Sequence, residues 1–224
     1  MLKKRCNPDS DRQDSHYHGG ASKALDSLMV LTPLTMLALG TAAPDFDLPD
    51  VVSGDSISLE KFVGQPGLLV MFICQHCPYV KHVQGELAAL GRDYGDRLGM
   101  VAISANDAEK YPDDGPEGLK AMATTLDFAF PYCYDESQQV AQAYTAACTP
   151  DFFLFSAGES GFELAYRGQL DSSRPGNDQP LTGKDLRAAM DAVLAKSSMP
   201  TEQVPSIGCN IKWKPGNEPS YFGA

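Results

Sequence analysis

Cys74 and Cys77 are the residues of this chain whose types and spacing most directly suit chemistry, and they lie in the segment Cys74-Gln75-His76-Cys77-Pro78. The pair follows an apolar run, Leu68 to Ile73, and precedes a helical pattern. Cα atoms one helical turn apart lie about 5 to 5.5 Å from each other, which is within the range of a disulfide. The positive partial charge at a helix N-terminus also favours thiolate over thiol. The spacing therefore predicts reversible thiol–disulfide chemistry at the end of a buried strand.

The order of the two cysteines predicts their roles. Cys74 is expected to be the attacking thiolate, because the first cysteine of such a pair is the more exposed one. Cys77 is then expected to resolve the mixed disulfide from inside the turn. A cationic or polarisable His76 would lower the pKa of Cys74 and make the disulfide more oxidising. The alternatives are a pair of buried structural thiols and an exposed, incidental histidine.

A metal site is the other chemistry that these side chains support. Thiolates and imidazole suit zinc, with Cys74, His76, Cys77 and one distant cysteine as ligands. However, His76 and Cys77 are adjacent at a helix start and point in different directions, and the chain has no second C-x-x-C. We therefore expect no metal and no other cofactor.

The elements that must position this pair follow from hydrophobic periodicity. The apolar run before Cys74 is typical of a strand buried on both faces. From Val80 to Tyr94, apolar residues recur in steps of three and four, as in a helix. The whole order is β-α-β-α-β-α-β-β-α, in which alternation implies parallel strands and a late hairpin around 157–161 adds antiparallel pairing. The expected fold is α/β, with a central mixed sheet flanked by helices and an N-terminal hairpin extension at 51–59.

Length and composition suit one globular domain with tails. The chain has 224 residues, of which 43% are hydrophobic and 21% charged. Its net charge of -11 argues against nucleic acid or an anionic membrane as a partner. The longest early apolar stretch, Leu28 to Gly40, is about 13 residues long and contains Pro33, so it is too short to span a bilayer.

This order of elements, with C-x-x-C after the first long strand, resembles the thioredoxin fold. Cys148-Thr149-Pro150 before the strand 151–155 supports the resemblance. In thioredoxin-like proteins a Thr-Pro at this place carries a cis peptide bond and faces the C-x-x-C. Such a proline turns the chain sharply and leaves neighbouring backbone groups free to pair with a substrate chain. The resemblance implies that Thr149 and Pro150 support the dithiol.

Within that superfamily the chain is similar to the peroxiredoxin-like branch, the AhpC/TSA or redoxin group. The resemblance covers about Met29 to Lys214. Four segments carry it: Pro44-Asp45-Phe46-Asp47-Leu48-Pro49, the C-x-x-C segment up to Lys81, Ser172-Ser173-Arg174-Pro175-Gly176-Asn177, and Gly208-Cys209-Asn210-Ile211-Lys212-Trp213-Lys214.

Three departures from these relatives concern the site. Peroxiredoxins carry P-x-x-x-T-x-x-C, and if Cys77 aligns with their peroxidatic cysteine, Val70 and Cys74 replace the proline and the threonine. Thioredoxins have tryptophan before the first cysteine, where this chain has Ile73. They also carry a buried aspartate in the preceding strand, which here has no acidic residue. A buried proton acceptor must therefore come from elsewhere, or proton transfer is left to solvent.

The remaining cysteines are too few and too scattered for a disulfide scaffold. Cys148 precedes the expected cis proline, so it should lie near the dithiol, either as core filler or as an exchange partner. Cys209 lies in an irregular tail beside Trp213. It is expected to be either a third redox thiol or a buried thiol that holds a packed tail. Cys133 is expected in the core.

The chain divides into three expected parts: a disordered leader at 1–28, a thioredoxin-like (redoxin) domain at 29–200, and an irregular tail at 201–224 that packs on the domain. The expected compartment is the cytoplasm. The alternative is the periplasm, if residues 1–43 act as a signal peptide.

The favoured function is a thiol–disulfide oxidoreductase that uses the C-x-x-C dithiol. Its partners would be protein or small-molecule disulfides and an unidentified electron donor, and the chain would be a monomer or a homodimer. The first alternative is an antioxidant thiol peroxidase in which Cys77 attacks peroxide and Cys74 or Cys209 resolves the sulfenic acid. The second is a non-catalytic binding module with the same fold.

Overall fold

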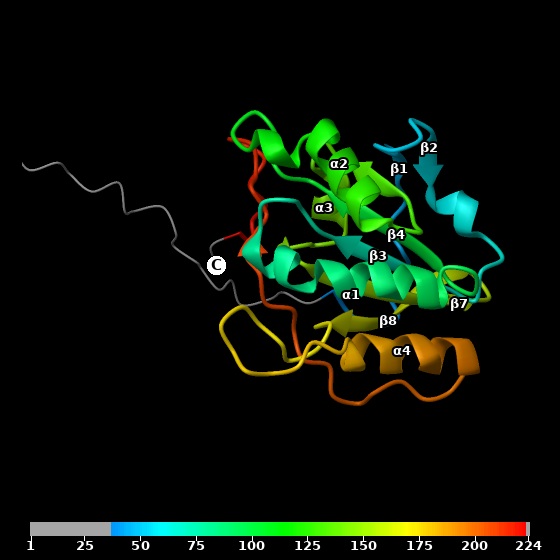
Figure 1. Ribbon diagram of the computed structural model, residues 1–224. Coiled ribbons are helices and arrows are strands. Elements are labelled where there is room, and N and C mark those ends of the chain that lie inside the picture. Colours follow the sequence, from blue (N-terminus) through cyan, green and yellow to red (C-terminus); the bar gives the residue numbers. More distant parts are fainter. Residues whose placement is uncertain (1–36, 223–224) are drawn as a thin grey trace, which may run out of the picture.

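A five-stranded mixed sheet forms the centre of the molecule, which a computed structural model describes for residues 37–222. The strand order is β5-β4-β3-β7-β8. β3, β4 and β5 run parallel, whereas β7 is antiparallel to both β3 and β8 (Figure 1). The strands are β3 (Gly67–Phe72), β4 (Gly99–Ser104), β5 (Tyr132–Tyr134), β7 (Asp151–Gly158) and β8 (Gly161–Gly168). The expected central mixed sheet is thereby confirmed.

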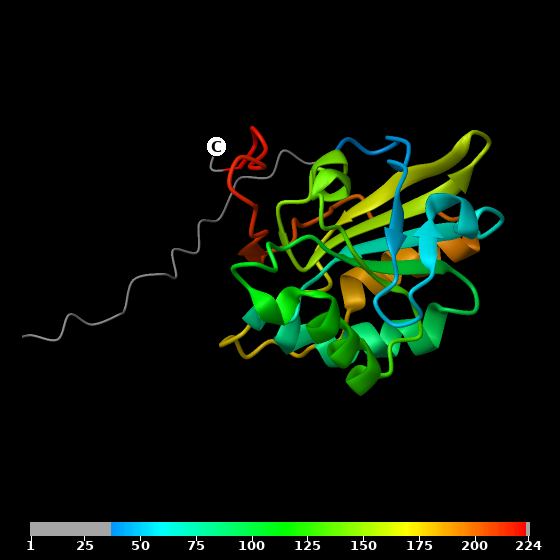
Figure 2. The ribbon, with the colours of Figure 1, turned by 90° about the horizontal axis from the view of Figure 1, so that it is seen from above.

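Helices cover both faces of this sheet. In the view from above (Figure 2), α1, α2 and α4 lie on one side of the sheet and α3 lies on the other. The bounds are α1 (Pro78–Tyr94), α2 (Pro116–Leu126), α3 (Gln139–Ala143) and α4 (Lys184–Ala195). A short 3-10 helix, η2 (Pro112–Asp114), precedes α2, and another, η1 (Leu59–Phe62), precedes β3.

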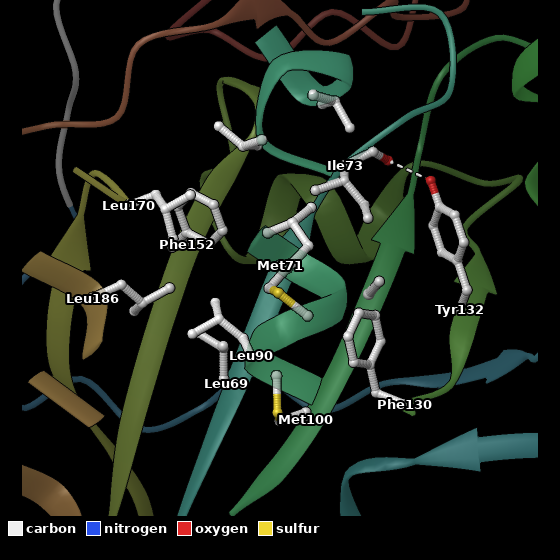
Figure 3. Close-up of a cluster of buried hydrophobic side chains, with 14 of the residues drawn as sticks. Leu69, Met71, Ile73, Leu90, Met100, Phe130, Tyr132, Phe152, Leu170 and Leu186 are labelled. Atoms are coloured by element: carbon white, nitrogen blue, oxygen red, sulfur yellow. Dashed lines mark hydrogen bonds between the residues drawn. The ribbon is translucent and has the colours of Figure 1, made fainter. Parts of the chain in front are cut away.

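Strand β3 is buried along its whole length, as its continuous apolar run predicts. Because side chains alternate along a strand, Leu69 and Met71 face the helices α1 and α4, as Figure 3 shows for this side of the sheet. Leu68 and Val70 face the opposite cluster, which includes residues of α3. The strand therefore ends at a point surrounded by core on both faces.

The expected N-terminal hairpin is present, but its first strand begins earlier than the sequence indicates. β1 (Asp47–Pro49) pairs antiparallel with β2 (Ser56–Ser58). The carboxylate of Asp50 accepts hydrogen bonds from the amide and hydroxyl of Ser53 at 3.0 and 2.7 Å, which stabilises the turn between them.

The C-terminal segment is irregular apart from one short strand. β9 (Cys209–Asn210) pairs antiparallel with β6 (Cys148–Thr149) in a separate two-stranded sheet. Ile211 and Trp213 lie in the core with 2% and 6% exposure, so the tail packs on the domain.

The expected leader at 1–28 lies outside the described residues, as does most of the segment 1–43 considered as a signal peptide. Among residues 37–222, no helix has the length and apolar character needed to cross a membrane.

Candidate redox site

Cys74 and Cys77 lie where β3 gives way to α1. Cys77 is the N-cap residue of α1, with Pro78 at the first helical position, where the missing N–H of proline does no harm. Their side chains hydrogen-bond to each other, and both are free thiols in this structure. The backbone just before them is held by Tyr132, whose hydroxyl donates to the carbonyl of Ile73 at 3.1 Å (Figure 3). The structure therefore brings the two predicted sulfurs together at the tip of the buried strand.

The segment formed by β6 and the following Pro150 faces these sulfurs. The Thr149-Pro150 peptide bond is cis, as the resemblance implies. The hydroxyl of Thr149 lies 3.3 Å from Cys74 Sγ, and Cys77 Sγ lies 3.2 Å from the Thr149 carbonyl oxygen. Thr149 thus contacts both sulfurs: its hydroxyl hydrogen-bonds to Cys74 and Cys77, and its carbonyl also lies beside Cys77.

A buried carboxylate that the sequence analysis did not single out completes the site. Asp114, from η2, is fully buried and accepts hydrogen bonds from the amides of Gln75 and His76 at 2.8 and 3.0 Å. Its second oxygen contacts His76 Nδ1 and accepts a hydrogen bond from the Asn106 side chain at 2.8 Å. Burial raises the pKa of Asp114, but the hydrogen bonds from His76 and Asn106 outweigh it and hold that pKa below its ordinary value. Asp114 is therefore an anion that organises the turn between the cysteines.

His76 is the exposed member of this pair. Its side chain is 26% exposed and its ring stacks on Tyr111, with centroids 5.0 Å apart and planes 10° apart. The Lys212 ammonium also lies over the Tyr111 ring, 5.8 Å from its centre. His76 thus connects a buried carboxylate to the surface of the protein.

The donor atoms of Cys74, His76 and Asp114 lie within 4.8 Å of one another. Thiolate, imidazole and carboxylate are all zinc ligands. Here, however, both carboxylate oxygens of Asp114 already accept hydrogen bonds, and one of them contacts Nδ1 of His76. The arrangement fits a hydrogen-bonded His–Asp pair better than it fits a metal centre.

Cys209 reaches the site from the C-terminal tail. In the register of the short sheet, Cys209 lies opposite Thr149, and its side chain hydrogen-bonds to Cys77. Figures 1 and 2 both show the tail beside the N-terminal end of α1. Three sulfurs therefore form a chain, from Cys74 through Cys77 to Cys209.

These contacts place the thiolate on Cys77. Hydrogen bonds from Cys209 and Cys74 strongly lower the pKa of Cys77, and the backbone amide of Val80, in the first turn of α1, acts in the same direction. The hydrogen bond to Cys77, burial, and the negative charge of Asp114 all raise the pKa of Cys74. Cys74 is thus a proton donor to its neighbour.

The expectation that Cys74 is the more exposed of the two cysteines is wrong. Cys74 and Cys77 both have 0% exposure, whereas Cys209 is partly exposed. Greater exposure was the reason to expect that Cys74 attacks first, and the structure does not show it. Burial and the nearby negative charge both disfavour a Cys74 thiolate.

Two further buried cysteines differ in where they lie: Cys148 is next to Thr149, and Cys133 lies in the core cluster on the opposite face of the sheet from the dithiol. Cys148 lies in β6 next to Thr149 and its thiol donates to the Pro150 carbonyl at 3.5 Å, so it lies near the dithiol, as expected. Burial raises its pKa well above the usual range. Cys133 is a fully buried residue of β5, as expected, and burial raises its pKa to about 12.

Comparison with known proteins places this geometry in a family. Residues 39–162 match the AhpC/TSA family, which is more than half of the chain. A thioredoxin-like protein, YneN from Bacillus subtilis (strain 168), is 31% identical over 97 residues, which cover 43% of this chain. The match spans only 54% of that relative's own length.

Two solved structures are similar over most of their length. An uncharacterized conserved protein from Geobacillus kaustophilus is 51% identical with a TM-score of 0.78, covering 81% of this chain and 95% of that one. A hypothetical protein from Sinorhizobium meliloti 1021 is 49% identical with a TM-score of 0.77, covering 80% and 97%. A putative thioredoxin from Neisseria meningitidis, 23% identical with a TM-score of 0.52 and covering 69% and 91%, shares the fold. The chain has a thioredoxin-like fold and belongs to the AhpC/TSA family.

Proposed function

We propose that this protein is a thiol–disulfide oxidoreductase whose redox couple is Cys74 and Cys77. The observation that carries the proposal is the hydrogen-bonded pair of buried sulfurs at the N-terminus of α1, facing Thr149 and the cis Pro150. A low-pKa thiolate beside a second thiol is what a reversible dithiol requires.

The reaction starts at Cys77. Its thiolate attacks one sulfur of a substrate disulfide, the substrate S–S bond breaks, and the leaving thiolate takes up a proton. Cys74 then loses its proton and attacks Cys77 Sγ, which releases the second substrate thiol and leaves a Cys74–Cys77 disulfide. Two electrons pass from the dithiol to the substrate.

The imidazole of His76 is the acceptor for the proton of Cys74, and the buried Asp114 carboxylate stabilises the cation that forms. The Asp114 carboxylate lies within 4.8 Å of Cys74 Sγ, and the partly exposed ring of His76 contacts that carboxylate. Because the His76 ring is partly exposed, it can pass a proton taken from Cys74 on to solvent. In this role the His76–Asp114 pair takes the place of the strand aspartate that the chain lacks.

A thiol peroxidase is the second candidate, and the burial of the sulfurs favours it. Because both are fully buried, a small oxidant reaches them more easily than a protein does. The Cys77 thiolate would cleave the O–O bond of a peroxide to give a sulfenic acid and an alcohol or water, and Cys74 would condense with it to release water. The Thr149 hydroxyl contacts Cys77 as well as Cys74, and it is the group available to orient the peroxide.

Two serine variants test the proposal. With insulin and with a small disulfide such as cystamine as substrates, Cys77→Ser should react no faster than a protein-free solution. Cys74→Ser should form a mixed disulfide on Cys77, detectable by intact mass. Cys133→Ser, remote from the site, is the matched control. If the Cys74 and Cys77 variants both reduce these disulfides as fast as the parent, the proposal is wrong.

A parallel measurement separates the two candidates. Reduced parent protein is mixed with hydrogen peroxide, and the rate is compared with that of free cysteine. A faster rate, with a sulfenic acid trapped on Cys77 by dimedone, indicates the peroxidase. A rate no higher than that of free cysteine, combined with rapid cystamine reduction, indicates the oxidoreductase.

A further inference from the structure

We propose that Cys209 is a third redox-active residue, which forms a disulfide with Cys77 from a tail strand that occupies the place of a bound substrate. This inference rests on the proposed function of the Cys74–Cys77 couple. It concerns which pair of sulfurs holds the disulfide after that couple has been oxidised, and which sulfur an external thiol attacks.

The tail uses the backbone edge next to the cis proline. β9 pairs antiparallel with β6, the two residues directly before Pro150, and Cys209 lies opposite Thr149. A substrate chain adding to this edge would make the same backbone hydrogen bonds. Gly208 permits the close approach, since a Cβ at that position would lie 2.0 Å from the Thr149 carbonyl oxygen. The protein thus carries its own strand, with a cysteine in it, at the position of a substrate disulfide.

Contacts made by the residues that follow Cys209 hold it in place. The amide of Ile211 donates to the Ala147 carbonyl at 3.1 Å, and the amide of Lys212 donates to the Asn106 side chain at 2.8 Å. Ile211 and Trp213 are buried in the core cluster that also contains Phe72 at the end of β3. Cys209 is therefore a fixed part of the site.

The three sulfurs allow a disulfide to move without any added oxidant. In the reduced site the hydrogen bond to Cys77, and then burial, raise the pKa of Cys209, and oxidation of Cys77 removes the first of these effects. Starting from the Cys74–Cys77 disulfide, Cys209 loses its proton and attacks Cys77 Sγ, a Cys77–Cys209 bond forms, and the Cys74–Cys77 bond breaks. The electron pair leaves on Cys74, which takes up the proton that Cys209 released. One disulfide and one thiol are present before and after the step.

The partial exposure of Cys209 allows an external thiol to reduce the site after this step. Cys74 and Cys77 are fully buried, whereas Cys209 is partly exposed, so the moved disulfide has one sulfur that an external thiol can reach. Attack on Cys209 releases Cys77 as the leaving thiolate. The hydrogen bonds from Cys74, the backbone amide of Val80 and the Thr149 side chain stabilise that thiolate. Exchange is faster when the leaving thiol has a low pKa. Cys209 is thus the point where a thiol donor returns electrons to the site.

Disulfide mapping tests this inference. The full-length parent, Cys74→Ser, Cys209→Ser and the control Cys133→Ser are oxidised with diamide, alkylated, and digested with trypsin without reduction. Cleavage places Cys74 and Cys77 together in peptide 62–81 and Cys209 in peptide 197–212. The expected product from Cys74→Ser is peptide 62–81 linked to 197–212. Cys209→Ser should give only the internal disulfide of 62–81, and the parent should give both species.

The variants also distinguish failure of this inference from failure of the proposed function. If Cys74→Ser gives no link between 62–81 and 197–212 while Cys209→Ser forms its internal disulfide and reduces cystamine, the role of Cys209 is refuted and the proposed function stands. If Cys209→Ser forms no internal disulfide, the Cys74–Cys77 couple itself is refuted. Cys209→Ala repeats the measurement if the serine variant does not fold.

A rate measurement tests the entry point directly. Oxidised parent and oxidised Cys209→Ser are reduced by excess glutathione, and the return of thiols is followed in time. The parent should be reduced several times faster, because its disulfide has a partly exposed sulfur. Equal rates would overturn the assignment of Cys209 as the entry point.

Discussion

The backbone amide of His76 donates a hydrogen bond to the buried carboxylate of Asp114 at 3.0 Å, and the imidazole of the same residue contacts the other carboxylate oxygen. One side chain therefore fixes both the backbone turn between the two cysteines and the orientation of the histidine ring. The turn is held from a residue 38 positions away in the chain. This contact makes the site depend on how η2 packs against the end of β3.

Asp114→Asn should destabilise the fold and alter the sulfur chemistry. The neutral amide would direct an NH₂ group at the donors of His76 and Asn106, at a cost of about 1 to 3 kcal/mol. Because Asp114 raises the pKa of Cys74, the variant should also lower the pH at which that thiol ionises. Urea denaturation measures the first effect, and the pH dependence of iodoacetamide alkylation measures the second. Asp113→Asn, at an exposed neighbouring carboxylate, should change neither.

The same residue predicts the sign of a pH effect on stability. The folded pKa of Asp114 is below its ordinary value of 3.8, so its stabilising contribution is present above 3.8 and is lost as the pH falls through the lower, folded pKa. The stability of the parent should therefore fall more steeply in acid than that of Asp114→Asn. Parallel unfolding curves across this pH range would contradict the assigned ionisation of Asp114.

Thr149→Val should make the Cys77 thiolate harder to form. The contacts with Cys209 and Cys74 dominate the lowered pKa of Cys77, and the hydroxyl of Thr149 adds to them. Valine keeps the shape and removes that hydroxyl, so the alkylation profile should move to higher pH. Thr149→Ser, which keeps the hydroxyl, is the matched control and should restore the profile. A valine profile identical to that of the parent would show that the hydroxyl does not stabilise the thiolate.

Gly208→Ala should separate the tail from the site. The added Cβ would lie 2.0 Å from the Thr149 carbonyl oxygen, so β9 must move away from β6. The variant should lose stability and give a lower yield of the link between Cys77 and Cys209. Gly85→Ala is the matched control, because Gly85 is exposed in α1 and its Cβ would meet no atom within 4 Å. That control should be more stable than the parent by about 0.5 to 1 kcal/mol.

Arg167→Met should be among the most destabilising single changes. Arg167 and Asp151 are each 1% exposed and lie 3.5 Å apart, with Asp151 directly after the cis proline. Removing the arginine leaves a buried carboxylate without its counter-charge, which costs about 3 to 5 kcal/mol.

The control for this pair is the double variant Arg167→Met/Asp151→Asn, which should recover part of the loss. Burial already raises the pKa of Asp151, against the effect of Arg167. A group whose folded pKa is raised binds its proton more tightly in the folded state, so Arg167→Met should regain stability as the pH falls. A loss in the single variant below about 1 kcal/mol would show that the pair acts like an exposed one.

The sheet and the sulfur pair could be predicted because both depend on patterns of residues that are close together in the sequence. The run from Leu68 to Ile73 allows little else than a strand buried on both faces, and β3 occupies it from Gly67 to Phe72. The spacing of Cys74 and Cys77, and the dipeptide Thr149-Pro150, are equally local signals. Their meeting in space follows from the topology that the alternating elements imply.

Asp114 could not be predicted in this way. It lies in a polar loop that also contains Asp107 and Asp113, and nothing in the local sequence distinguishes the carboxylate that turns inward. That choice depends on the packing of η2 against the turn after β3. The relative exposure of Cys74 and Cys77 cannot be predicted for a related reason. The tail strand β9, which carries Cys209, packs beside the site, and it pairs with β6, which lies more than 50 residues earlier in the chain.

The contact between Cys77 and Cys209 joins two distant parts of the chain. A covalent bond between them would close a loop of more than 100 residues, and in the chain-entropy treatment a loop of that size restrains the unfolded chain by about 4.7 kcal/mol. Formation of this disulfide would then stabilise the folded domain against unfolding, and its reduction would remove that stabilisation. The redox state of one sulfur pair would thus set how readily this protein unfolds.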